Sequence, residues 1–286
     1  MDGERLDAET PVGVLIGNAL AKGTARLERS IRMVENDEDD AIHQVRVSCR
    51  RLRSDLKLFR KLLDGDWATE LRSDLAALAQ ACGETRDLEV IAALVRENGS
   101  SEDNEEHVDT ILTTLTLGLG RAAARSAEVV LGESTKDLLT TLDAVTTAPG
   151  LKPKADKPCS EVLPQLLRSA TAKFTQEAEK LEPWSPDDDW HEVRLLAKRV
   201  RYAADTSASV LGDEAKTTAA HAATYQELLG QHQDHCAAAD ALTAMAANAA
   251  AQDDPELSFT LGRLTERHRA ARRPLREQFL SLYHRP

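Results

Sequence analysis

Two segments of the sequence carry the same pattern of one histidine and four cations. The first segment runs from His43 to Arg53, and the second begins 148 residues later and runs from His191 to Arg201. Both read His-x-x-Arg-x-x-x-(Arg/Lys)-Arg-x-Arg. Guanidinium and ammonium groups donate charge-assisted hydrogen bonds to anionic oxygens. The pattern therefore predicts two copies of one anion-binding segment.

The spacing of the first segment places its cations on one face of an α-helix. At about 100° per residue, this face keeps its members within about 60° of one line. We call it the basic ridge, and its members are His43, Arg46, Arg50, Arg53, Lys57 and Arg60. Each pair of like-charged neighbours costs about 0.2–0.5 kcal/mol, which a bound anion would offset. From Arg46 to Arg60 the ridge extends about 21 Å, which suits a linear polyanion better than a single phosphate. A charged face that meets only solvent is the alternative, and the matching histidines and the scarcity of acids on the ridge argue against it.

The histidines of the two segments, His43 and His191, allow three interpretations: a structural residue, a metal ligand or a donor to phosphate. The neighbours on the same helical face are arginines, which repel a metal cation, so we favour the phosphate donor. His232, His235 and Cys236 form the best metal candidate by composition. They have no matching histidines in the first half, and we expect them on a helix surface or lining a pocket. No metal site and no cofactor are therefore predicted.

The sequence contains no recognisable catalytic pattern. It has no P-loop, no nucleophile elbow, no His-Glu-x-x-His and no paired carboxylates facing a histidine. We therefore expect a binding protein rather than an enzyme. A metal-dependent enzyme that processes phosphate remains an alternative, as does binding of nucleic acid or nucleotides. The net charge of −12 and an aromatic content of 3% argue against nucleic acid, because base stacking needs aromatic side chains.

The elements that carry these residues are predicted to be helices throughout. The chain of 286 residues is rich in Leu and Ala, and few of its segments alternate at period two. We expect the first basic helix over 41–63, helix breaks at Gly83 and Gly230, and a kink or an end at Pro274. The acidic N-terminus, the lack of a long apolar run and the four scattered cysteines predict a cytoplasmic protein with free thiols and no membrane segment.

The chain divides into an N-terminal tail, 1–13, and one repeated domain, 14–286. A segment containing Pro149, Gly150, Pro153 and Pro158 separates a first helical half, 14–148, from a second, 161–286, so we assign 149–160 as the linker. Gly83-Glu-Thr-Arg-Asp in the first half aligns with Gly230-Gln-His-Gln-Asp in the second. An internal repeat of this length predicts two helical bundles related by an approximate two-fold axis.

These segments resemble the CHAD family, the conserved histidine α-helical domain. The matching stretches are HQVRVSCRRLRSDLKLF at 43–59, HEVRLLAKRVRYAAD at 191–205, GETRDLEV at 83–90 and LLGQHQD at 228–234. The resemblance implies an all-α fold of two four-helix bundles around a basic central channel. It also implies binding of inorganic polyphosphate and recruitment to polyphosphate granules.

The resemblance further implies that the ridge residues line the channel with residues of the second segment and of other helices. These are His191, Arg194, Lys198, Arg201, Arg86, Arg121, Arg125, Arg263 and Arg267. The sequence departs from the pattern at Gln233, which replaces the arginine found at Arg86, and at Asp205, which ends the second basic segment. The β-stranded triphosphate-tunnel domain that often accompanies this family is not recognisable in the chain.

Overall fold

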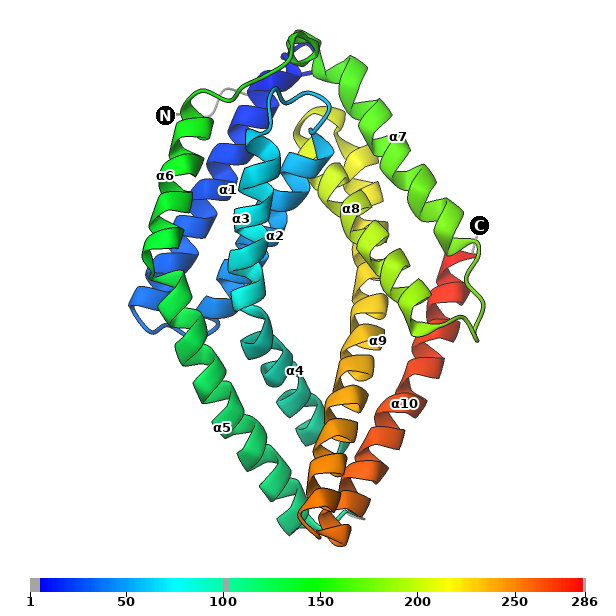
Figure 1. The fold of residues 1–286 in the computed structure, drawn as a ribbon. Helices are drawn as coiled ribbons and strands as arrows, with labels where there is room; N and C mark the ends of the chain where they lie inside the picture. The colour runs from blue at the N-terminus through cyan, green and yellow to red at the C-terminus, as the bar shows by residue number, and fades with distance from the viewer. Residues whose placement is uncertain (1–5, 100–102, 285–286) are drawn as a thin grey trace. The chain divides into compact units, whose positions relative to one another are not determined.

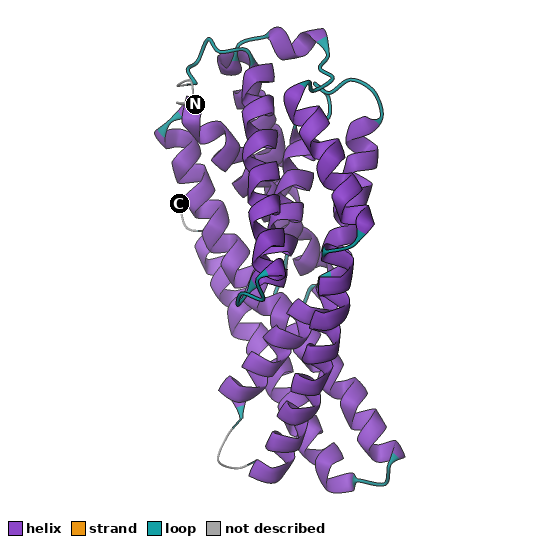
Figure 2. Cartoon of the chain, turned by 90° about the vertical axis from the view of Figure 1, so that its left-hand side faces the viewer, coloured by secondary structure: helices purple, strands orange, loops and turns teal. Residues whose placement is uncertain are grey.

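The computed structural model describes residues 6–99 and 103–284 of the protein. These residues form ten α-helices and one 3₁₀ helix, and they form no strand beyond two isolated β-bridges (Figure 2). The predicted all-α class is confirmed. The first five residues of the predicted N-terminal tail and the last two residues of the domain lie outside the described residues. No helix of the described chain is long and apolar enough to cross a bilayer.

The helices gather into two compact units that each combine distant parts of the chain. Unit 1 takes residues from 1–83, 124–176 and 196–223, and unit 2 takes them from 84–123, 177–195 and 224–286. Three helices, α5 (Glu105–Val130), α8 (Asp187–Leu211) and α9 (Asp213–Ala251), contribute long segments to both units. The two sequence-related halves and the two-fold relation between them remain predictions.

Unit 1 is centred on four helices that pack side by side. They are α1 (Val12–Glu35), α2 (Ala41–Leu58), α3 (Trp67–Ala81) and α6 (Glu133–Thr147) (Figure 1). Their shared core includes Leu27, Leu52, Leu56 and Leu75, which are almost completely buried. Burial of each such side chain contributes about 1.5–3 kcal/mol. The apolar stripe beside the basic ridge therefore fixes the rotation of α2, and with it the direction of the ridge.

The predicted linker is an ordered part of unit 1. Residues Pro153–Asp156 form the 3₁₀ helix η1, and α7 (Cys159–Ala178) follows. The linker pairs with the chain after α2, because Asp64 N donates to Gly150 O and Lys152 N donates to Leu62 O, both at 2.9 Å. These bonds hold the linker against the turn that follows the basic helix.

Unit 2 contains α4 (Gly83–Asn98), α10 (Pro255–Tyr283) and parts of α5, α8 and α9. One core cluster joins Val95, Ile111, Leu242 and Leu264. A second set of contacts is aromatic, with the ring centroids of Trp190 and Phe279 5.8 Å apart. The aromatic set anchors the beginning of α8, which carries His191.

Two predicted helix boundaries are wrong. The basic helix ends at Leu58, not at Leu63, because Phe59, Leu62 and Leu63 turn into the core, and Arg60 lies in this turn. Helix α9 runs through Gly230 without a break, since one glycine costs a helix only about 1 kcal/mol. Of the kink or end predicted at Pro274, the end does not occur, because α10 continues to Tyr283 and the buried Phe279 helps to hold its last turns. The break at Gly83 is confirmed, because α3 ends at Ala81 and α4 begins at Gly83.

Candidate anion-binding site

Six cations from four helices and one turn of unit 1 form what we call the cation cluster. Its members are Arg53 and Lys57 on α2, Arg60 in the following turn, Arg72 on α3, Lys173 on α7 and Arg199 on α8. Burial and then the positive charges of Arg199, Arg72, Lys173 and Arg53 lower the pKa of Lys57. Burial and then the charges of Arg53, Arg60 and Arg199 lower the pKa of Arg72. The six side chains therefore share one positive field.

Carboxylates do not neutralise this cluster. Within residues 6–99 and 103–284, none of its six members forms an ion pair with an acidic side chain. Three guanidinium nitrogens, Nε of Arg50, Arg53 and Arg72, are buried and have no hydrogen-bond partner in this part of the chain. A buried donor without a partner costs about 1–3 kcal/mol. An anion that accepts these hydrogen bonds and balances the charge would remove both costs.

The sequence predicted only half of this cluster. Arg53, Lys57 and Arg60 were candidates, whereas Arg72, Lys173 and Arg199 were not. Arg199 belongs to the repeated segment, but it falls off the line of the ridge, as its counterpart Arg51 does. Arg72 and Lys173 lie in no motif, and only the packing of α3 and α7 brings them to the cluster. The repeated segment could have pointed to Arg199, but no sequence pattern pointed to the other two.

The beginning of the ridge makes contacts within unit 1. Arg46 Nη1 donates to the backbone oxygen of Ala79 at 2.9 Å, which satisfies a carbonyl in the last turn of α3. A Cβ added to Gly83 would lie 3.2 Å from the same nitrogen, so the glycine leaves room for this arginine. His43 is half-buried on the same helix. This end of the ridge thus joins α2 to the α3–α4 connection.

A second group of charges in unit 1 is paired. Arg51 Nη1 lies 2.9 Å from Asp205 Oδ2, and its guanidinium carbon lies 4.9 Å from the centre of the Tyr202 ring. Arg201 also approaches Asp205, at 3.9 Å. Thr206 Oγ1 donates to Asp55 Oδ1 at 3.0 Å, and burial raises the pKa of Asp55 to about 6. Lys198 is buried on the same helix. The network joins α2 to α8 through opposite charges.

The second histidine segment begins in unit 2. Nδ1 of His191 lies 2.7 Å from Oε1 of Gln233, so Gln233, which replaces an arginine in the repeat, holds the imidazole ring. A Cβ added to Gly230 would lie 3.9 Å from Nε of Arg194. Each repeat therefore places its glycine beside the arginine three residues after its histidine.

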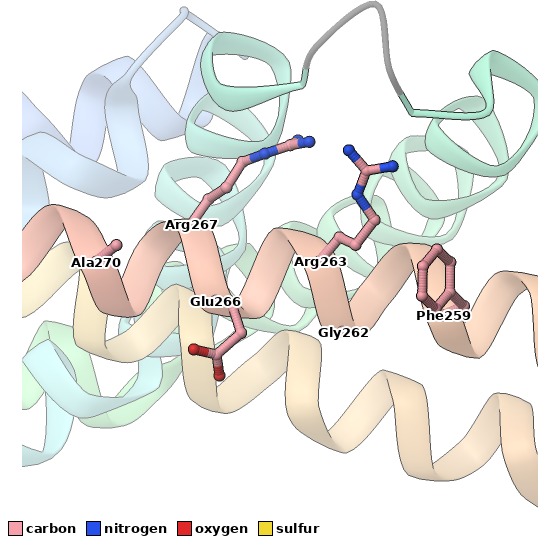
Figure 3. Close-up of a pocket in the computed structure, with 6 residues that line it drawn as sticks. All are labelled: Phe259, Gly262, Arg263, Glu266, Arg267 and Ala270. Atoms are coloured by element: carbon pink, nitrogen blue, oxygen red, sulfur yellow. The ribbon is translucent and has the colours of Figure 1, made fainter.

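The remaining predicted residues are mostly paired or exposed. Arg86 Nη1 lies 3.1 Å from Glu89, while Arg121 and Arg125 are exposed on α5. Figure 3 shows Arg263 and Arg267 extending from the same side of α10, and Glu266 pointing to the other side. Arg267 binds both carboxylate oxygens of Asp103, a fully buried side chain, and Arg263 Nε lies 3.5 Å from the same carboxylate. The two arginines line a pocket of about 580 Å³ with Phe259 at one end.

The histidine and cysteine cluster of the sequence lies in unit 2 with Asp187. Potential metal-ligating atoms of Asp187, His232 and Cys236 lie within 4.8 Å of one another. Two arginines already bind these acceptors: Arg276 Nε donates to His232 Nε2 at 2.9 Å, and Arg272 Nη1 lies 2.5 Å from Asp187. Burial and then the charge of Arg276 lower the pKa of His232 to about 4, which keeps the ring neutral as an acceptor. The guanidinium groups thus occupy the positions from which these residues would bind a cation.

Comparison with known proteins places the chain in a family. A model of the CHAD domain matches residues 18–243. Uncharacterized proteins from two strains of Mycobacterium tuberculosis are 28% identical over 295 residues, a match that covers 96% of this chain and 54% of each relative. The chain therefore spans about half the length of these curated relatives.

Two solved structures share the fold. The CHAD domain from the plant Ricinus communis has a TM-score of 0.83 at 21% identity, covering 100% of this chain and 96% of that one. PptA from Streptomyces chartreusis has a TM-score of 0.78 at 23% identity, covering 96% of this chain and all of that one. Since the family match covers most of its length, the chain belongs to the CHAD domain family.

Proposed function

We propose that this protein binds inorganic polyphosphate without catalysing a reaction, and that the cation cluster of unit 1 is its main contact with the chain of phosphates. The observation that supports this is the gathering of six cations that no acidic side chain of the described residues neutralises. In a protein with a net charge of −12, such a cluster is a local positive site that favours an external anion of high charge density. Membership of the CHAD family agrees with the proposal.

A linear polyphosphate suits the cluster better than a single phosphate does. The six cations come from α2, its following turn, α3, α7 and α8, so one phosphate cannot accept hydrogen bonds from all of them. A polymer places a charge at every repeat and releases condensed counterions when it binds. Base stacking would require exposed aromatic rings beside the cations, whereas the exposed aromatic side chains of Trp184 and Phe259 belong to unit 2 and the cation cluster to unit 1. Polyphosphate is therefore the preferred ligand over RNA.

Removal of the cluster tests the proposal. The cluster variant carries Arg53→Ala, Lys57→Ala, Arg72→Ala and Arg199→Ala. A control variant removes four exposed cations that pair with nearby acids: Lys136→Ala, Lys180→Ala, Lys216→Ala and Arg273→Ala. Both variants lose four positive charges. We expect the affinity for long-chain polyphosphate to fall at least 100-fold in the cluster variant and less than about fivefold in the control, because exposed charges are screened.

Equal losses in the two variants would show that only net charge matters and would contradict the site. A competition assay with RNA at equal phosphate concentration distinguishes polyphosphate from nucleic acid as the preferred ligand. Release of phosphate from polyphosphate would indicate an enzyme. In cells we expect the protein in the cytoplasm at polyphosphate granules, with the cluster variant dispersed and the control variant localised as the wild type.

A further inference from the structure

Just beyond the two basic segments, the charge is reversed at one pair of aligned positions. With the offset of 148 residues, Arg51 aligns with Arg199, and Lys57 aligns with Asp205. The first copy thus has a cation where the second has a carboxylate. All four residues belong to unit 1.

The structure relates these four residues reciprocally. Arg51 of α2 lies 2.9 Å from Asp205 of α8, while the charge of Arg199 on α8 acts on Lys57 of α2. Corresponding positions therefore interact electrostatically twice across the same pair of helices, once as an ion pair of opposite charges and once as a repulsion between like charges. Only the second interaction contributes to the cation cluster.

We infer that Asp205 is a specificity-determining residue that withholds Arg51 and Arg201 from anions and so confines strong binding to the Lys57 side of the α2–α8 pair. The inference rests on the proposed function. Asp205 Oδ2 lies 2.9 Å from Arg51 Nη1 and 3.9 Å from Arg201 Nε, so one carboxylate offsets two cations. A phosphate that approached these arginines would have to displace Asp205 or bear its repulsion.

Stability alone gives the carboxylate a small role. The side chains of Arg51 and Asp205 are 21% and 33% exposed, and ion pairs that solvent reaches contribute little to stability. Without Asp205, Arg51 would still interact with Asp55, whose carboxylate lies 3.8 Å from Nε of Arg51, and with the ring of Tyr202. Replacement of Asp205 by Asn retains an acceptor for Arg51 and removes only the charge, so the fold should persist.

The experiment measures binding of long-chain polyphosphate to the wild type, to Asp205→Asn and to Asp213→Asn at several salt concentrations. Asp213 is the matched control, because it is an exposed residue of unit 1 that pairs with Lys216, and its replacement changes the net charge equally. We expect Asp205→Asn to bind at least threefold more tightly than the control. Its salt dependence should steepen by roughly 0.7 in log–log slope for each cation released.

Asp205→Lys, which copies the residue at position 57, should strengthen binding further, and it supplies a second measurement if either variant unfolds. If Asp205→Asn and Asp213→Asn both bind polyphosphate with the affinity and the salt dependence of the wild type, the inference is overturned and the proposed function stays intact. Absence of binding by the wild type would overturn both.

Discussion

Pairing with a carboxylate divides the arginines of this protein into two groups. Arg267 and Arg276 bind acidic side chains and backbone oxygens of their own unit. Arg53 and Arg72 have buried guanidinium nitrogens and no acidic partner among the residues described. A polyanion gains most from the second group, because it need not displace an existing partner.

The sign of the charge at position 57 tests this division at the level of one residue. Lys57→Asp places an acid within the field of Arg199, as Asp205 does for Arg51. We expect it to lower the affinity for polyphosphate about tenfold more than Lys57→Ala does, since it both removes a cation and neutralises another. Binding measured by fluorescence anisotropy gives the comparison, and equal affinities of the two variants would contradict it.

Residue types and spacing predicted where cations gather, but not which of them find partners. The repeat identified α2 and the start of α8 as basic segments. The sequence could not reveal that Asp103 holds Arg263 and Arg267, or that Arg72 and Lys173 approach α2, because these contacts depend on how distant helices pack.

Close packing of α1 against α2 positions the basic ridge. A Cβ at Gly23 of α1 would overlap the side chain of Leu52, whereas a Cβ at Gly17 on the same helix meets nothing within 4 Å. We expect Gly23→Ala to lower the free energy of unfolding by about 1–3 kcal/mol through overpacking. Gly17→Ala should raise it by about 0.5–1 kcal/mol, because alanine favours the helix. Urea unfolding of both variants measures this difference, and stabilisation by Gly23→Ala would refute the packing.

Buried histidines on α9 and α10 make the stability of the protein depend on pH. Burial lowers the pKa of both His232 and His268 from 6.5 to about 4, with Arg276 adding to the effect at His232 and His235 at His268. Their contribution is complete above pH 6.5, decreases as the unfolded chain takes up protons, and is lost near pH 4. Each histidine should remove on the order of 3 kcal/mol between pH 7.5 and 4.

A variant isolates this effect from the titration of carboxylates. His268→Leu removes one of the two groups, so its free energy of unfolding should change less between pH 7.5 and 4.5 than that of the wild type. The measurement is urea unfolding at both pH values. An unchanged pH dependence would show that His268 does not titrate in this way.

Most helices followed from periodicity, because amphipathic spacing and the Gly83 break are local properties. The continuity of α9 and α10 could not be predicted in this way, because Gly230 and Pro274 favour a break locally and tertiary contacts compensate for them. The division into two units that mix both halves of the chain could not be predicted from local patterns at all.

At the scale of the whole molecule, a net charge of −12 coexists with a local excess of positive charge. Long-range repulsion of anions is screened beyond about 8 Å at physiological ionic strength, so the local cluster determines binding. We expect the logarithm of the affinity for polyphosphate to fall linearly with the logarithm of salt concentration. The slope of the four-residue cluster variant should be shallower by roughly 2.8, at about 0.7 per lost contact. Isothermal titrations between about 50 and 200 mM salt measure the slope, and an affinity independent of salt would contradict the electrostatic account.

The most direct test of the central claim is an NMR titration that follows the Nε–H signals of the arginine side chains as polyphosphate is added. The account predicts that Arg53, Arg72 and Arg199 shift first and saturate together, while Arg276, whose Nε donates to His232, stays unchanged. Shifts confined to arginines outside the cation cluster, such as Arg263 and Arg267, would contradict it.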